Sequence, residues 1–414
     1  MKLAAALLVL APALAHASGP ARPFPQHVTY AAGALRPSPS AAAQDAAVAA
    51  YYDQWKADFV TGAGAAPGQF RIRFGKAAPN AALTVSEGQG YGMVIVALLA
   101  GHDPDAQALF DGLWAFARAH PSIVDARLMA FQVPPPPDEP GGTDSAFDGD
   151  CDMAYALLLA DAQWGSAGAV DYAAAAATLI GAIAESTIGP HSRLPLLGDW
   201  TEPDGRKFSE YTPRSSDFML DHFRAFGAAT GDPLWAEVLA ASQDAIAGLA
   251  PYGFDKKRGV ATGLLPDFLR VSPLTLAPKP VGGKFLEASS DGSYSYNATR
   301  DPWRIGTDAL LTGDARSLAA ARAVAGWSRL ATGGDPQQLR AGYRLSGKPL
   351  GHSHFFTIVF AAPLGVAAMN APGEQAWLDA LYAAVAATHE DYYEDSVTLQ
   401  CLLVMSGNWW APGA

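Results

Sequence analysis

Apolar residues recur at spacings of three and four along most of this chain, which is typical of α-helices with one buried face. Segments rich in Ala and Leu follow one another and end near Gly, Pro or Asp, which are common helix boundary residues. The pattern predicts helices over residues 41–60, 87–101, 104–120, 150–165, 171–186, 215–231, 233–249, 300–313, 315–331, 352–368, 373–389 and 395–407. Strand signals are few and short, such as QFRIRF at 69–74.

The number of helices indicates the fold class. No low-complexity linker separates the helices, so we expect one all-α domain. Some segments, such as 155–160, are apolar nearly all round and fit an inner layer covered by an outer one. Two concentric rings of six helices, an (α/α)₆ barrel, is the closed arrangement that fits best. Other helical bundles stay open on periodicity alone.

The first 17 residues have the pattern of a signal peptide. Lys2 precedes a short apolar run, and Ala15-His16-Ala17 forms a small-residue cleavage site. We therefore expect a signal peptide at 1–17, a domain at 18–414, and a secreted or periplasmic protein. The alternative is an apolar N-terminal helix that stays in the fold. No later stretch is long and apolar enough to span a membrane, so we expect no membrane partner. We also expect a monomeric protein.

Composition excludes several classes of protein. With 50% apolar and 16% charged residues, the 414-residue chain is too apolar for a disordered protein. A formal charge of −12, from 40 acidic and 28 basic residues, argues against a nucleic-acid partner. Two cysteines cannot form a disulfide framework or a four-thiolate zinc site. Cys151 and Cys401 lie in apolar helical sequence, which favours buried free thiols, although a disulfide stays open.

Two acidic clusters lie at predicted helix starts. In TVSEGQGYGM (84–93), Glu87 could be catalytic, or it could be a first-turn acid that follows a Ser86 cap. Asp148, Asp150 and Asp152 have the 1,3,5 spacing of a calcium loop, but Gly is missing at position six and Glu at position twelve. One aspartate is expected to cap the following helix, which leaves at least one for another role.

A third cluster, at 284–304, combines Glu287 with tyrosines, a tryptophan and arginines. It suits a sugar-binding surface, or equally a helix–loop junction filled by aromatic rings. The pair His352 and His354 lacks a third ligand, so we expect no metal. Without a nucleotide, serine-hydrolase or metalloprotease motif, we expect no cofactor, and acid chemistry remains. Glycoside hydrolysis needs two positioned carboxyl groups.

The chain also resembles a known family. SEGQGYGM (86–93) is similar to the SEAQGYGM motif of glycoside hydrolase family 8, and residues 146–164 resemble that family's second signature, A-[ST]-D-[AG]-D before an apolar helix ending in Trp. GDW (198–200), RSSDFML (214–220), GLLPD (263–267) and residues 296–308 continue the resemblance, which runs from about 23 to 410. It departs from the usual pattern at Gly88 and Phe147.

The resemblance implies an (α/α)₆ barrel that hydrolyses β-1,4-linked glycans with inversion. It implies that Glu87 is the general acid and that Asp148 contacts the sugar at the cleavage subsite. Many members carry the base as Asp in Y-D-A-x-R, but this chain has Asn297 there, and an amide cannot deprotonate water. In a second branch with Asn, the Glu of F-L-E is the base, which implies Glu287. Inverting carboxyls should stand about 6.5–9.5 Å apart.

The second branch includes cellulases, lichenases and chitosanases, which sets the expected substrate. We expect a neutral β-glucan, with chitosan as the alternative and xylan as a third choice. The residues expected to bind the polysaccharide are Tyr91, Trp200, Tyr296, Asn297, Arg300 and Trp303. Two other classes stay open: a non-catalytic glycan-binding protein that has lost its base, and a polysaccharide lyase.

Overall fold

The structure is a computed structural model, and it describes residues 19–136 and 142–413. The signal peptide expected at 1–17 lies outside the described residues. Within them there are twelve α-helices, whose bounds follow. They are α1 (Ala41–Phe59), α2 (Ser86–Leu98), α3 (Ala106–Ala119), α4 (Phe147–Trp164), α5 (Tyr172–Ser186), α6 (Leu220–Thr230), α7 (Leu234–Gly248), α8 (Asp301–Thr312), α9 (Ala315–Thr332), α10 (Ala362–Met369), α11 (Gln375–Val385) and α12 (Tyr392–Ser406).

The strands are short and lie in the loops. They form four antiparallel pairs: β1 (Val60–Thr61) with β2 (Arg71–Ile72), β3 (Thr84–Val85) with β4 (Gln132–Val133), β5 (Phe254–Asp255) with β6 (Val260–Ala261), and β7 (Leu269–Val271) with β8 (Pro278–Pro280). Short 3₁₀ turns complete the described elements: η1 (Asn80–Ala82), η2 (Ser215–Asp217), η3 (Ala250–Tyr252), η4 (Ala298–Arg300), η5 (Pro336–Gln338) and η6 (Ile358–Phe360).

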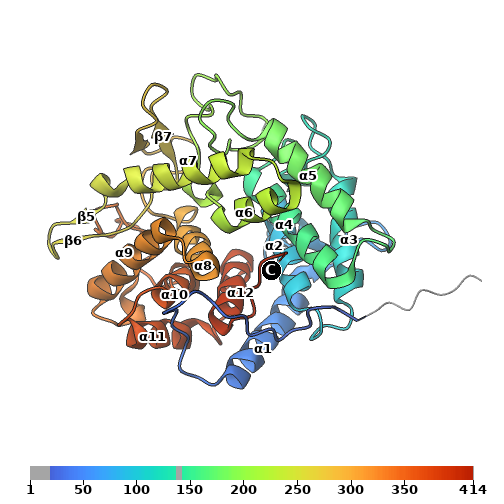
Figure 1. The fold of residues 1–414 in the computed structure, drawn as a ribbon, viewed down its shortest axis with the longest axis horizontal. Coiled ribbons are helices and arrows are strands. Elements are labelled where there is room, and N and C mark those ends of the chain that lie inside the picture. Colours follow the sequence, from blue (N-terminus) through green and yellow to red (C-terminus); the bar gives the residue numbers. More distant parts are fainter. Residues whose placement is uncertain (1–18, 137–141, 414) are drawn as a thin grey trace, which may run out of the picture.

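The helices form two concentric rings (Figure 1). The even-numbered helices lie toward the centre, and the odd-numbered helices surround them. All residues of α10 are buried, whereas α1 buries a single stripe, as expected for an inner and an outer helix. The last helix, α12, packs against α2 and so closes the inner ring. The predicted (α/α)₆ barrel is confirmed.

Two inner helices start later than the sequence pattern predicts. Helix α10 begins at Ala362 rather than 352, because buried Ser353 donates its hydroxyl to the carbonyls of Gly342 and Leu350 and belongs to a loop. Helix α6 begins at Leu220 rather than 215, because the Ser215 hydroxyl donates to the Pro266 carbonyl from a separate 3₁₀ turn. Apolar residues continue through both loops, because residues 215–219 and 358–361 are also buried.

Glycines allow close packing at one end of the inner ring. A Cβ at Gly149 of α4 would lie 2.7 Å from the Glu87 nitrogen of α2, so only glycine permits these two helix starts to touch. A Cβ at Gly88 would lie 2.7 Å from the Tyr392 hydroxyl oxygen of α12. The starts of α2, α4 and α12 therefore meet at one end of the barrel.

A charged network lies inside the barrel, below this end. The Arg304 guanidinium donates to both Asp152 carboxylate oxygens, at 2.9 and 2.6 Å, and His222 lies 2.8 Å from the same carboxylate. The other His222 nitrogen lies 2.9 Å from Asp221. Despite the burial of its side chain, Asp152 has a lowered pKa, because Arg304 and His222 favour its charged form.

Two further predictions concern cysteines and membranes. Cys151 and Cys401 are buried free thiols, as favoured from the sequence. Within the described ranges, no helix combines the length and the apolar character needed to cross a bilayer.

Candidate active site

The predicted acidic residues meet at the starts of the inner helices. Glu87 is the second residue of α2, Asp148 is the second residue of α4, and Arg300 directly precedes α8. Helix N-termini carry partial positive charge, so they favour carboxylates placed there. The ring of inner helices thus brings together side chains that are far apart in the sequence.

The predicted capping roles are wrong. The residues before α2 and α4 are Val85 and Ala146, and neither helix start has a side-chain cap. The Ser86 hydroxyl has no hydrogen-bond partner among the described residues. Asp148 and the other two aspartates lie inside α4, because that helix begins at Phe147 rather than 150.

Asp150 and Asp152 take structural roles. Asp150 accepts a hydrogen bond from the Met129 backbone nitrogen, and Asp152 pairs with Arg304. Of the three aspartates, only Asp148 shares the Arg300 guanidinium with Glu87. This agrees with the expectation that at least one aspartate has a role other than capping.

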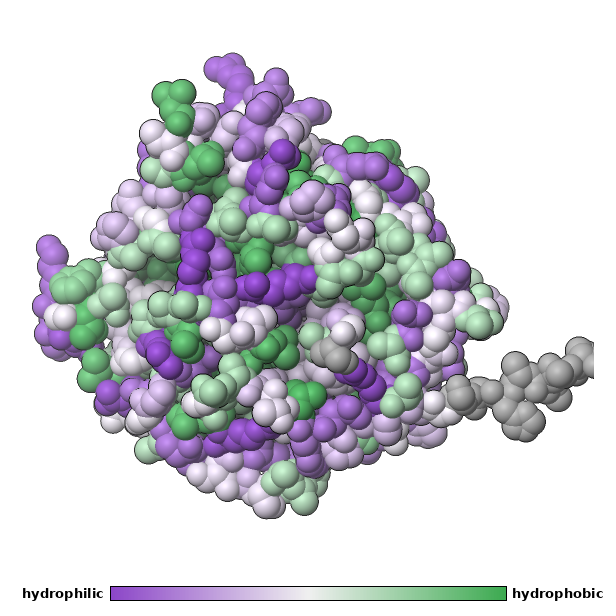
Figure 2. Space-filling model, viewed as in Figure 1, coloured by the Kyte–Doolittle hydropathy of each residue, from purple (hydrophilic) through white to green (hydrophobic). Residues whose placement is uncertain are grey.

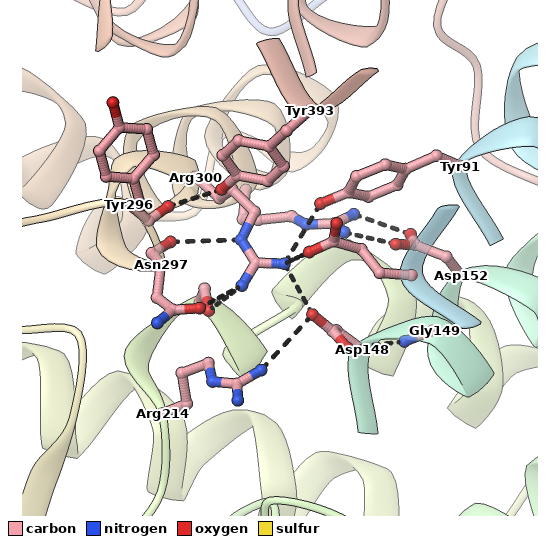
Figure 3. A network of polar contacts seen from close by, with 12 residues as sticks. Tyr91, Asp148, Gly149, Asp152, Arg214, Tyr296, Asn297, Arg300 and Tyr393 are labelled. Atoms are coloured by element: carbon pink, nitrogen blue, oxygen red, sulfur yellow. Dashed lines mark hydrogen bonds and ion pairs between the residues drawn. The ribbon is translucent and has the colours of Figure 1, made fainter. Parts of the chain in front are cut away.

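Arg300 contacts both Glu87 and Asp148, and Figure 3 shows it beside Asp148. Its Nη1 lies 2.8 Å from Glu87 Oε2 and 2.6 Å from Asp148 Oδ2. Its Nη2 donates to Ser216 Oγ at 2.8 Å and to Asn297 Oδ1 at 3.2 Å. The sequence predicts that Arg300 binds the sugar. Because its side chain is only 1% exposed, Arg300 instead positions the two carboxyl groups from inside the barrel.

Glu287 lies on the outer side of this network. Its side chain is 44% exposed, and Arg214 Nη2 lies 3.1 Å from Oε1. Asn297 Nδ2 donates to Oε2 at 2.7 Å. Arg214 also lies 3.7 Å from Asp148 Oδ2, so it connects Glu287 to the inner carboxyl groups. A chain of hydrogen bonds connects Glu287 to Glu87 through the Asn297 amide and the Arg300 guanidinium.

The loop that carries Glu287 is held by one buried carboxylate. Asp291 accepts hydrogen bonds from the backbone nitrogens of Leu286, Glu287 and Ala288, at 2.7, 3.1 and 2.7 Å. These bonds fix the turn of the loop, so the exposed Glu287 side chain projects from an ordered backbone.

Glu87 and Asp148 differ in their electrostatics. Burial and the nearby Asp148 charge together raise the pKa of Glu87 to about 7, against the opposing effect of Arg300. Two arginines, Arg300 and Arg214, outweigh burial at Asp148 and lower its pKa. Below about pH 7 the site therefore holds a proton on Glu87 beside an ionised Asp148.

Tyr392 completes the surroundings of Glu87. Its hydroxyl donates to Glu87 Oε1 at 3.0 Å, from the first residue of α12. The small Gly88 leaves room for this ring, as its missing Cβ would otherwise meet the hydroxyl. The departure from the family pattern at Gly88 thus has a steric explanation.

The candidate sugar-binding aromatics fall into two groups. Tyr91 and Trp303 are buried core rings, the alternative that the sequence left open, and Tyr91 accepts a hydrogen bond from Arg300. Tyr296 is 39% exposed, and Trp200 is partly buried against Phe208. Both rings are therefore accessible to a ligand, unlike Tyr91 and Trp303.

Sequence reasoning missed several contributors. Arg214 is the first residue of the motif RSSDFML (214–220), but nothing in that motif predicts its contact with Glu287. Tyr392 precedes the helix predicted at 395–407, so it was assigned to no element. Phe131 and Phe74 are 38% and 37% exposed, and they lie near Glu87 through Ser86 and Tyr392. They are far from the acidic clusters in sequence, and no local signal identifies them.

The arrangement defines a class of enzyme. One carboxyl is shielded and protonated near neutral pH, a second is exposed and ion-paired, and an ionised aspartate lies between arginines beside them. These are the groups that acid–base hydrolysis of a glycosidic bond requires. In the described part of the chain, no cluster of three or more potential ligands could hold a metal ion.

Comparisons with known proteins identify the family. The family model for glycosyl hydrolases family 8 matches residues 23–407, so the chain belongs to this family and is a glycoside hydrolase. A beta-glucanase from Niallia circulans is 41% identical over 97% of this chain and 94% of that protein. An endoglucanase from Bacillus sp. (strain KSM-330) is 36% identical over 94% of this chain and 82% of that protein.

A solved structure is also similar over almost the whole chain. The apo beta-1,3-1,4-glucanase from Paenibacillus sp. X4 is 40% identical and matches with a TM-score of 0.85. The match covers 94% of this chain and 99% of that structure. The resemblance inferred from the sequence motifs is confirmed.

Proposed function

We propose that this protein is an endo-acting β-glucanase that hydrolyses β-1,4 bonds of a β-glucan with inversion. The observation that carries the proposal is the placement of Glu287, held at 3.1 Å by Arg214 and at 2.7 Å by Asn297, across Arg300 from the protonated Glu87. The relatives named beta-glucanase and endoglucanase support a glucan rather than chitosan as the substrate. The proposed enzyme acts as an exported monomer.

In the proposed mechanism, Glu87 donates its proton to the glycosidic oxygen as the bond to the anomeric carbon breaks. Glu287 takes a proton from a water molecule whose oxygen attacks the opposite face of that carbon. Asn297 and Arg214 orient the Glu287 carboxylate toward this water. The ionised Asp148 orients the sugar at the cleavage site.

The same contacts complete the cycle. After proton donation, the new Glu87 carboxylate is stabilised by the Arg300 guanidinium and the Tyr392 hydroxyl. Before the next turnover, Glu87 regains a proton from solvent and Glu287 releases one. The raised pKa of Glu87 favours this reprotonation near neutral pH.

The base assignment predicts the effect of Glu287→Ala. Without a base, the rate of release of reducing ends should fall by about 10²–10⁴-fold on the preferred polymer. The assay compares mixed-linkage β-glucan, soluble cellulose, chitosan and xylan, with unsaturated products monitored by ultraviolet absorbance. Near-normal turnover by the variant would contradict the assignment to Glu287.

Glu237→Ala is a matched control for this experiment. Glu237 is 54% exposed and pairs with Arg193 at 2.8 Å, so it resembles Glu287 in exposure and ion pairing but lies outside the site. We expect wild-type activity from it. Unsaturated products, or a wild type that is inactive on every polymer, would contradict the proposed function.

The pKa of Glu87 predicts the alkaline limit of activity. A general acid works only when protonated, so kcat/KM should fall as pH rises through about 7, the raised pKa of Glu87. A carboxyl at its ordinary pKa near 4.5 would cause this fall well below neutrality. Initial rates from pH 4 to 9 test the expectation, and a decline centred near 4.5 would contradict it.

A further inference from the structure

A pocket lined by basic residues lies away from the carboxyl cluster. It has a volume of about 840 Å³, which is within the range of ligand sites. Its cations are Lys256, Lys257, Arg258, Arg340 and Lys348, and we call this set the basic pocket. The pocket-lining residues include a single carboxylate, Asp255, although acidic residues outnumber basic ones 40 to 28 in the whole chain. The local charge is therefore opposite to the net charge.

The pocket is formed by two segments that face one another. The turn between β5 and β6 carries Lys256, Lys257 and Arg258, and this hairpin projects at the left edge of Figure 1. The loop after α9 carries Arg340 and Lys348. In Figure 2 the same edge of the molecule combines hydrophilic and hydrophobic residues.

Two of the five cations are held in place by the fold. Arg258 pairs with Asp255 at 2.8 Å and donates to the carbonyls of Leu330 and Ala331, both at 3.1 Å. Arg340 donates to the Leu339 carbonyl at 2.8 Å. These bonds give the pocket ordered walls, which reduces the entropy lost when a ligand binds.

The three lysines are available for a ligand. In the described parts of the chain, Lys256, Lys257 and Lys348 have no carboxylate within ion-pair distance. Like charges placed together without partners repel one another, and a bound anion relieves that repulsion. The pocket therefore favours a ligand that carries several negative charges.

We propose that the basic pocket binds an anionic polysaccharide whose sugars carry carboxylates. A single small anion would meet only solvated ammonium groups, which bind weakly one at a time, whereas a polymer can contact all of them together. Phe254, 47% exposed on β5 beside the lysines, offers a ring face to a sugar. Because the chain belongs to a family of glycoside hydrolases, a polysaccharide is favoured over a nucleic acid as the polymer.

The pocket borders the loop system of the carboxyl cluster. Tyr343, which lines the pocket, forms a backbone bridge with Tyr294, and Tyr294 precedes Tyr296 and Asn297 by two and three residues. An anionic polysaccharide bound here would hold the enzyme beside material that contains its substrate. This role is separate from hydrolysis, so its test does not depend on the proposed catalytic residues.

The test measures binding of a galacturonic acid decamer by fluorescence anisotropy, using the full chain. At low salt we expect binding by the wild type, and about tenfold weaker binding by the triple variant K256E/K257E/K348E. Binding should also weaken as salt rises, because salt screens exposed charges. Hydrolysis of neutral β-glucan by the triple variant should be unchanged, which shows that it folds.

Controls separate the pocket from general charge effects. Lys279→Glu on β8, outside the pocket, and Lys257→Glu, inside it, make the same change of charge at exposed lysines, so Lys279→Glu should bind the decamer like the wild type and Lys257→Glu more weakly. The methyl-esterified decamer, which lacks the charges, should not bind. The proposal is overturned if the wild type does not bind, or if the triple variant and Lys279→Glu bind equally. Equal or tighter binding of a thymidine decanucleotide would overturn the assignment to a polysaccharide.

Discussion

Glu87→Gln should reduce kcat on polymeric β-glucan by about 10²–10⁴-fold, because an amide cannot give a proton to the leaving oxygen. The change keeps the shape of a side chain that is neutral below its pKa of about 7, so the protein should remain folded. Reducing-end assays measure the loss, and circular dichroism checks the fold. Retained activity on the polymer would show that Glu87 is not the acid.

A substrate with a good leaving group distinguishes the acid from a structural residue. In a 2,4-dinitrophenyl glucan oligomer, the dinitrophenolate group leaves without needing a proton. The Glu87→Gln variant should therefore cleave this substrate at close to the wild-type rate, whereas the Glu287→Ala variant should still be slow. Glu185→Gln is the control: Glu185 is 67% exposed and pairs with Arg127 at 2.7 Å, and this variant should behave like the wild type on both substrates. Equal losses on both substrates would point to damaged geometry instead.

Arg304→Met should lower the free energy of unfolding by about 3–5 kcal/mol, because it leaves a buried carboxylate without its main partner. Arg304 donates to both oxygens of Asp152, and neither side chain is more than 2% exposed. The measurement is urea denaturation monitored by tryptophan fluorescence. A loss below 1 kcal/mol would show that His222 alone compensates the Asp152 charge.

The control for this prediction is an ion pair of the same type on the surface. Arg316 and Asp244 lie 2.5 Å apart, with side chains 42% and 77% exposed. Because exposed pairs contribute about 0–1 kcal/mol, Arg316→Met should leave the unfolding transition nearly unchanged. The two variants remove the same guanidinium group, so their difference isolates the effect of burial.

The barrel could be predicted because its helices differ in burial. An inner helix such as α10 is apolar nearly all round and an outer one such as α1 buries one face, so the two-layer arrangement is visible in the sequence. The starts of helices were harder to predict where the preceding loop is itself buried, because the loop then has apolar residues as a helix does. The residues before α10 keep an apolar pattern although hydrogen bonds from Ser353 hold them in a loop.

The site was predictable in its acidic residues but not in their supports. Glu87 and Glu287 lie in motifs whose resemblance to the family assigns them roles, and the structure brings both to Arg300 and its neighbours. The contacts of Arg214 and Tyr392 depend on where helices far apart in sequence meet. Tyr91 and Trp303 have the composition expected of sugar-binding residues, and only their burial shows that they are core.

The closure of the inner ring by α12 has a consequence for how the protein is made. The Tyr392 hydroxyl reaches Glu87 across 305 positions of sequence, and α2 packs against α12. Contacts of such long range form late in folding, because the loop they close is costly in entropy. The environment of Glu87 is therefore complete only after the last helix has been synthesised. A ribosome-bound or truncated chain that lacks α12 has eleven of the helices, but its Glu87 lacks the hydrogen bond from Tyr392.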